Sequence, residues 1–201
     1  MTIFDIGGHD GTLTLFFAKS VGPNGKIYAF EPNPFNYEYL LQNLQLNNSM
    51  NVEPFQLAIG ASSYNAKFVF RNDGTFGTGT LDKEIQQQII NEQNYSIVEV
   101  KVESIDNLFN NKKLSKPDFV KIDVEGLEFD ILQGMQMTLK EYKPNLFIEI
   151  HGANINDKMK NANEIISFLT GFNYSFYHIE TQQIVSIKTT DLPIQGHLFC
   201  K

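Results

Sequence analysis

The chain has 201 residues, of which 42% are hydrophobic and 19% are charged. This length and balance fit one globular domain with a single core and exclude a disordered chain. Its 16 basic and 23 acidic residues give a net charge of −7, which repels polyanions, so we expect no nucleic-acid partner.

The cysteine content and the apolar runs bear on where the protein resides. Cys200 is the sole cysteine in the sequence, so an internal disulfide is excluded. The first residues lack the basic region and apolar stretch of a signal peptide. No run of about 18 apolar residues occurs, so we expect no membrane span and a cytoplasmic location.

The first part of the chain alternates short apolar runs with helical patterns. We predict strands over Thr2–Ile6, Lys26–Phe30 and Val52–Leu57. Helices are predicted over Thr12–Ser20 and Pro34–Leu46, the second with proline in its first turn. This alternation is typical of a parallel sheet with helices on both faces.

Residues 61–103 follow another pattern, and we predict a hairpin and loop insertion between the third and fourth core strands. Ala66–Arg71 and Ser96–Val102 alternate apolar and polar residues, which favours an antiparallel pair. A polar helix is predicted over Asp82–Gln93. The Gly- and Thr-rich segment 72–80 is a candidate lid over a ligand, or else a hairpin tip.

The last part of the chain returns to alternating strands and helices. The predicted helices are Ser104–Phe109, Glu128–Tyr142 and Ala162–Leu169, and the predicted strands are Phe119–Ile122, Asn145–Ile150, Tyr174–Ile179 and Gly196–Cys200. The last two strands are expected to form an antiparallel edge. The fold class is therefore α/β, with a mostly parallel, seven-stranded, Rossmann-like sheet in a single domain over residues 1–201.

A glycine-rich loop joins the first strand to the first helix. Asp5 ends the strand, and Gly7, Gly8 and Gly11 follow, with His9 between them. Glycine lets the backbone approach a ligand closely, and a helix start offers unpaired N–H groups and a positive dipole. The loop is either a binding site for a ligand carboxylate or phosphate, or a structural turn. Its spacing is not the dinucleotide fingerprint Gly-x-Gly-x-x-Gly.

An acidic residue follows the second predicted strand. Glu31 lies 20 residues after Gly11, where a carboxylate can accept hydrogen bonds from ribose hydroxyls. A surface acid or helix cap is the alternative interpretation. Together with the glycine loop, Glu31 indicates nucleoside binding, but the pair does not separate a methyl donor from a nicotinamide cofactor.

Four segments together resemble the FkbM family of methyltransferases. They are Asp5–Gly11, Tyr28–Pro34, Lys121–Gly126 and Phe147–His151, and the resemblance covers about residues 2–152. It implies the class I methyltransferase fold and S-adenosylmethionine (SAM) as the methyl donor. It also implies an acceptor hydroxyl on a sugar, a glycan or a small natural product.

The resemblance and the predicted strand ends together suggest the site residues. The expected donor-binding residues are Asp5, Gly7, Gly8, His9, Gly11, Glu31, Pro32, Ala58, Ile59 and Asp123. Asp123, Glu125 and His151 are expected to surround the transfer, because an alcohol acceptor loses a proton and a positioned base assists this loss. Glu128, in a first helical turn, is expected to complement the helix dipole.

Several alternatives remain open at this point. Asp123, Glu149 and His151 together have the chemistry of divalent-cation ligands, although our prediction is a site without metal. A NAD-dependent oxidoreductase and a non-catalytic nucleoside-binding or scaffold domain are the competing functions. Relatives in the family commonly carry upstream segments, so the site is open, or a second copy or another partner covers it, or the gene product is short.

Overall fold

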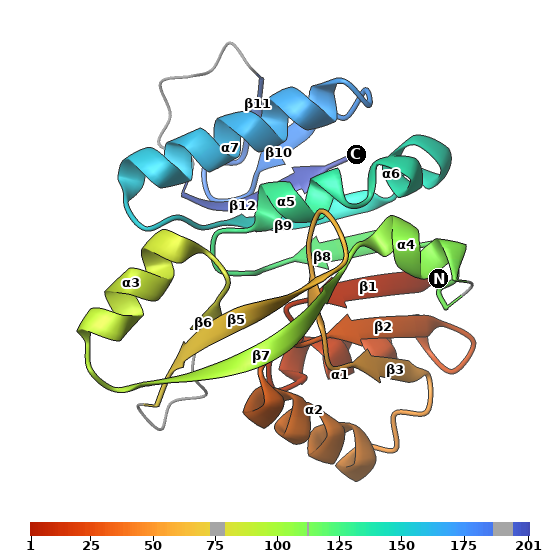
Figure 1. Ribbon diagram of the computed structural model, residues 1–201. Helices are drawn as coiled ribbons and strands as arrows, with labels where there is room; N and C mark the ends of the chain where they lie inside the picture. The colour runs from red at the N-terminus through yellow and green to blue at the C-terminus, as the bar shows by residue number, and fades with distance from the viewer. Residues whose placement is uncertain (73–78, 112, 187–194) are drawn as a thin grey trace.

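A mixed eight-stranded sheet forms the centre of the computed structural model, which describes residues 1–72, 79–111, 113–186 and 195–201 (Figure 1). The strand order is β3-β2-β1-β8-β9-β12-β10-β11, parallel from β3 to β9 and antiparallel beyond. The strands are β1 (Thr2–Ile6), β2 (Lys26–Phe30), β3 (Val52–Phe55), β8 (Phe119–Ile122), β9 (Asn145–Ile150), β10 (Phe176–His178), β11 (Gln183–Val185) and β12 (Gly196–Cys200).

Helices cover both faces of this sheet, as the sequence predicts (Figure 1). The helices of the described residues are α1 (Thr12–Val21), α2 (Pro34–Leu46), α3 (Lys83–Asn91), α4 (Ile105–Asn110), α5 (Glu128–Gln133), α6 (Gln136–Tyr142) and α7 (Ile155–Thr170). Of these, α3 packs on the second sheet described below and not on the main sheet. Among the described residues, no helix is both long and apolar enough to cross a bilayer.

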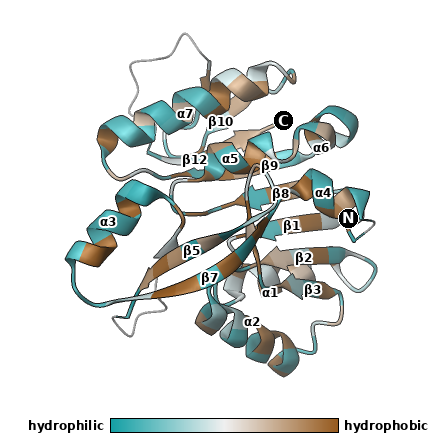
Figure 2. Cartoon of the chain, viewed as in Figure 1, coloured by the Kyte–Doolittle hydropathy of each residue, from teal (hydrophilic) through white to brown (hydrophobic). Residues whose placement is uncertain are grey.

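Successive side chains along each strand point to opposite faces of the sheet, and this alternation determines which helices each residue contacts. In β1, Ile3 packs with α1 on one face, whereas Phe4 and Ile6 join the main core against α4 to α7 on the other. In Figure 2 the strands of both sheets carry hydrophobic segments beside hydrophilic ones, while much of α7 is hydrophilic. The same alternation places Asp5 on the face of α1, where its carboxylate accepts a hydrogen bond from Thr14 Oγ1 at 2.6 Å.

A second, four-stranded sheet comes from the middle of the chain. Its order is β4-β7-β5-β6, and its strands are β4 (Ala58–Ile59), β5 (Tyr64–Arg71), β6 (Gly79–Thr80) and β7 (Tyr95–Glu103). The predicted hairpin is confirmed, because β5 and β7 pair antiparallel along their length. Asp82 begins α3 by accepting hydrogen bonds from two backbone N–H groups at 2.9 Å. Of the candidate lid, residues 73–78 lie outside the described residues.

Three expectations about the elements need correction. The main sheet has eight strands rather than seven, because Gln183–Val185 pairs with β10 as an additional edge strand. The third strand ends at Phe55, and Ala58–Ile59 pairs with β7 in the second sheet instead. The helix α7 begins at Ile155, well before the predicted start, because the Asn154 side chain caps it.

The helix predicted over Glu128–Tyr142 is divided into α5 and α6 at Gly134 and Met135. Asp106 of α4 causes the second start, since its carboxylate accepts the backbone N–H groups of Met137 and Thr138 at 2.8 and 3.0 Å. Gly134 itself packs directly on the backbone, because a Cβ there would lie 2.0 Å from the Gly60 carbonyl oxygen.

The two edges of the main sheet differ from its inner strands. At one edge, β3 contains Pro54, which has no backbone N–H to donate. At the other, β11 is only three residues long within the described chain.

We expect Gly134→Ala to lower the free energy of unfolding by about 1–3 kcal/mol, because the added methyl group overlaps the Gly60 carbonyl. Urea denaturation followed by circular dichroism measures this change. Gln133→Ala, at the exposed neighbouring position, is the control and should change the value by less than about 0.5 kcal/mol. Equal midpoints for the two variants would contradict the close-packing argument.

Candidate active site

A pocket of about 380 Å³ opens at the carboxyl ends of β1, β2 and β8, beneath residues of the second sheet. The sequence-predicted residues that line it are Gly7, Gly8, His9, Glu31, Pro32, Ala58, Ile59, Asp123 and Glu125. Phe68, Gly79 and Thr80 line it from the second sheet. The structure thus brings together the glycine loop, the acid after β2 and the acids after β8.

Two predicted donor-binding residues, Asp5 and Gly11, do not line the pocket but support the glycine loop. Asp5 is completely buried beneath the pocket. Gly11 begins α1 with a φ of 87°, and a Cβ there would lie 2.5 Å from Leu40 Cδ1. Gly7 also has a positive φ of 83°, and its Cβ would lie 1.9 Å from the Asp123 carbonyl oxygen. Glycine is therefore required at both positions for backbone geometry and close packing.

Glu31 holds the glycine loop against the end of β2. Its carboxylate accepts hydrogen bonds from the backbone N–H groups of His9 and Asn33, both at 2.8 Å. The side chain is nearly buried, and burial raises the pKa of Glu31 above its usual range despite these bonds. Each carboxylate oxygen has a second lone pair, so Glu31 can also accept from a ligand hydroxyl.

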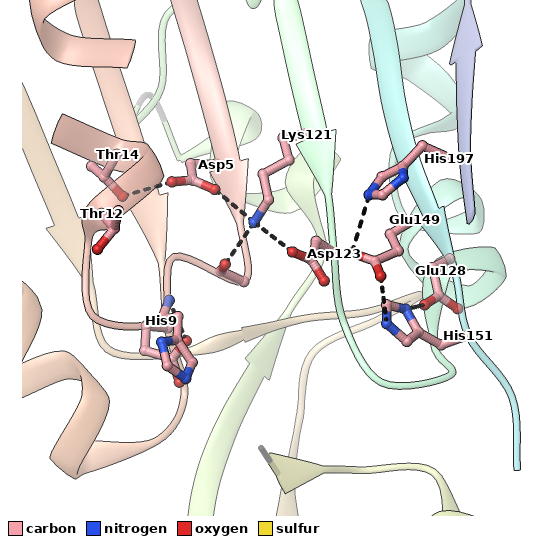
Figure 3. Close-up of polar contacts among 12 residues, drawn as sticks. Asp5, His9, Thr12, Thr14, Lys121, Asp123, Glu128, Glu149, His151 and His197 are labelled. Carbon is pink, nitrogen blue, oxygen red and sulfur yellow. Dashed lines mark hydrogen bonds and ion pairs between the residues drawn. The ribbon is translucent and has the colours of Figure 1, made fainter. Parts of the chain in front are cut away.

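Lys121 is a site residue that the sequence reasoning missed. Its ammonium lies 2.8 Å from the Gly7 carbonyl oxygen, 3.1 Å from Asp5 Oδ1 and 3.3 Å from Asp123 Oδ2 (Figure 3). Burial opposes the charge, but the two carboxylates outweigh it and raise the pKa of Lys121. The sequence offers one signal, because Lys121 is the one charged residue of an otherwise apolar strand. Its pairing in register with Asp5 is visible only in the structure.

His151 follows β9, and a fully buried acid fixes the orientation of its ring. Its Nδ1 lies 2.9 Å from Glu128 Oε1, and Asn161 of α7 donates to Glu128 Oε2 at 2.6 Å. The other ring nitrogen, Nε2, faces Glu149 at 3.4 Å (Figure 3). Glu128 therefore does more than complement the helix dipole, and neither it nor Asn161 was assigned this role from sequence.

The charge of His151 follows from these neighbours. Burial disfavours the imidazolium, but the hydrogen bond to Glu128 and the charges of Glu128, Glu125 and Glu149 outweigh it and raise the pKa of His151 to about 9. At neutral pH this side chain is accordingly a cation that can donate a hydrogen bond.

Glu149 links His151 to a second imidazole on β12. His197 Nε2 lies 3.4 Å from Glu149 Oε2, and the His197 ring stacks on Phe147 with centroids 5.0 Å apart. Polar atoms of Asp123, Glu149 and His151 lie within 4.8 Å of one another, so the group that the sequence suggested is also a group in space.

The second sheet and α3 contact both loops that carry the predicted catalytic residues. Thr80 Oγ1 donates to the Glu125 carbonyl oxygen at 2.6 Å, beside the pocket. Gln88 of α3 donates to the Ala153 carbonyl at 3.2 Å, two residues after His151. The inserted segment therefore holds the loops after β8 and β9 in place.

Comparisons with known proteins address the family. The family described as methyltransferase FkbM domain matches residues 5–176. Methyltransferase 1 of Beauveria bassiana is 28% identical over 161 positions, covering 74% of this chain and 64% of that protein. Hexuronic acid methyltransferase AglP of Haloferax volcanii is 28% identical over 149 positions, covering 74% of this chain and 55% of that protein. The chain thus spans less than two thirds of either curated relative.

Solved structures share the fold at low sequence identity. Methyltransferase FkbM from Methylobacillus flagellatus superimposes with a TM-score of 0.66 at 14% identity, covering 100% of this chain and 43% of that chain. The O-methyltransferase TomG of Streptomyces achromogenes, solved in complex with SAM, gives a TM-score of 0.55 at 13% identity, covering 99% and 71%. The Rossmann-like class I methyltransferase fold is thereby confirmed. With a family match over most of its length, the chain belongs to the FkbM methyltransferase family.

Proposed function

We propose that this chain is a SAM-dependent O-methyltransferase that acts on a hydroxyl group of a sugar, a glycan or a small natural product. The observation that carries the proposal is one pocket lined by the glycine loop, by Glu31 and by Asp123 and Glu125. Family membership supports methyl transfer, and the hexuronic acid named for the Haloferax relative supports a sugar-like acceptor.

The pocket fits a nucleoside-containing donor. Its volume of about 380 Å³ is in the range of sites for small ligands. In the proposal, the Glu31 carboxylate accepts hydrogen bonds from the ribose hydroxyls, and Pro32, Ala58 and Ile59 contact the adenine. The loop before α1 holds the amino-acid end, with Asp5 and Gly11 keeping that loop in shape.

The acids after β8 face the other end of the proposed donor. SAM supplies a methyl group bound to a sulfonium, which leaves as a neutral thioether. As the acceptor oxygen forms its new bond to carbon, its O–H proton becomes acidic enough for a carboxylate to accept. We assign this proton to Asp123 or Glu125, which line the pocket, and assign to the His151 imidazolium the orientation of the acceptor by hydrogen bonding.

Donor binding is tested by titration calorimetry with SAM and, separately, with NAD. We expect SAM alone to bind, and Glu31→Ala to weaken it about tenfold or more, because hydrogen bonds to a charged acceptor are lost. Glu38→Ala, on the exposed side of α2, is the control and should leave affinity unchanged. Affinity for NAD would favour the oxidoreductase alternative, and unchanged SAM affinity in Glu31→Ala would refute the ribose assignment.

Methyl transfer itself is tested with labelled SAM and a panel of hydroxylated sugars and glycosides. We expect label in an ether-linked methyl group, with a rate at least about tenfold lower in Asp123→Asn if this carboxylate accepts the proton. SAM binding without any labelled product across the panel would favour the non-catalytic alternative.

The charge of His151 gives a separate prediction. In Glu128→Gln the pKa of His151 should fall from about 9 toward 6.5, because the buried carboxylate is lost. NMR titration of the ring measures the pKa, and Glu141→Gln on the exposed surface is the control. Because the folded pKa is the higher one, His151 stabilises the fold fully below pH 6.5, and this stabilisation is lost as the pH rises through about 9. A pKa near 9 retained in Glu128→Gln would contradict this account.

A further inference from the structure

The pocket is strongly acidic. Four of its lining side chains are carboxylates: Asp10, Glu31, Asp123 and Glu125. Among the described residues, Lys121 is the only lysine or arginine that lines it. The pocket therefore favours a cationic ligand, because few charges offset these acids and part of the surroundings excludes water.

Lys121 offsets this negative charge only in part. Its ammonium lies between Asp5 Oδ1 at 3.1 Å and Asp123 Oδ2 at 3.3 Å, with the Gly7 carbonyl oxygen at 2.8 Å. The group Asp5–Lys121–Asp123 thus holds two carboxylates against one ammonium. Asp5 is fully buried and bonded to Thr14, whereas the Asp123 side chain is 35% exposed and lines the pocket. Asp123 is consequently the carboxylate of this group that faces the ligand.

Asp123 stands at the end of the pocket away from the acid assigned to the nucleoside. Glu31 follows β2 and Asp123 follows β8, and one strand, β1, lies between β2 and β8. The part of the donor that meets Asp123 is therefore the part that carries the sulfur. Donor and demethylated product differ at that sulfur by one positive charge, while the rest of the molecule is shared.

We propose that Asp123 and Lys121 are specificity determinants that make the pocket prefer the cationic donor over its neutral demethylated product. This inference rests on the proposed function. Asp123 attracts the sulfonium and has no comparable attraction for the thioether, whereas Lys121 tempers the attraction so that the donor is not held too tightly. The expected consequence is that, when donor and demethylated product are present at equal concentrations, more of the protein binds the donor than the product.

The test compares the dissociation constants of SAM and of S-adenosylhomocysteine by titration calorimetry. Asp123→Asn should lower the preference for SAM about fivefold, as expected for one charge removed near the sulfur in a partly solvated pocket. Lys121→Met should change the preference in the opposite direction. Glu53→Gln, which removes an equal charge from the outer strand β3, is the matched control and should leave the preference unchanged.

The ratio of the two constants separates charge from structural damage, because a distorted pocket weakens both ligands together. An unchanged ratio in Asp123→Asn, with both ligands still bound, would overturn the inference and leave the proposed function intact. If circular dichroism shows that Lys121→Met does not fold, the ratio of the two constants in Asp123→Asn alone tests the inference. If the unaltered protein binds neither ligand, the proposed function fails instead.

Discussion

A buried lysine holds together the two strand ends on which the site depends. Lys121 connects the acid of β1, the acid after β8 and the backbone of the glycine loop through one ammonium group. Burying charges costs several kcal/mol for each ion, and only close pairing offsets that cost. The position and the charge of the site are therefore set by the same contact, and removal of one partner would leave another buried charge without compensation.

Around this contact, residues from distant elements fix the remaining groups. Glu128 and Asn161 orient His151 from α5 and α7, and Thr80 of the second sheet binds the Glu125 carbonyl. Such support restricts side-chain rotation around the candidate site, which the proposed methyl transfer, with its strict line of approach, requires. The central sheet supplies the backbone positions, and the helices and the inserted segment supply the orientation.

The sequence predicted the regular elements well because their signals are local. The bounds of β1, β2, β8, β9 and β12 agree with the predicted ranges, since each apolar run ends at glycine, proline or polar residues. The pocket also joins most of the predicted donor residues, because ends of parallel strands share one rim. Their chemical roles stay proposals.

What local patterns missed depends on contacts between residues far apart in the chain. The ion pair of Lys121 with Asp5 requires the register of two strands more than a hundred residues apart. The break at Gly134 arises from Asp106 and Gly60, and nothing in the intervening helical pattern indicates it. The role of Glu128 likewise depends on where β9 ends relative to α5.

The edges of the main sheet bear on how this protein meets other molecules. A free strand edge normally offers a row of backbone donors and acceptors to a strand of a neighbouring chain. Here Pro54 removes a donor from one edge, and the three residues of β11 leave little length at the other. Extension of the main sheet from one molecule into the next is thus disfavoured at both ends, which reduces the risk of aggregation through these strands.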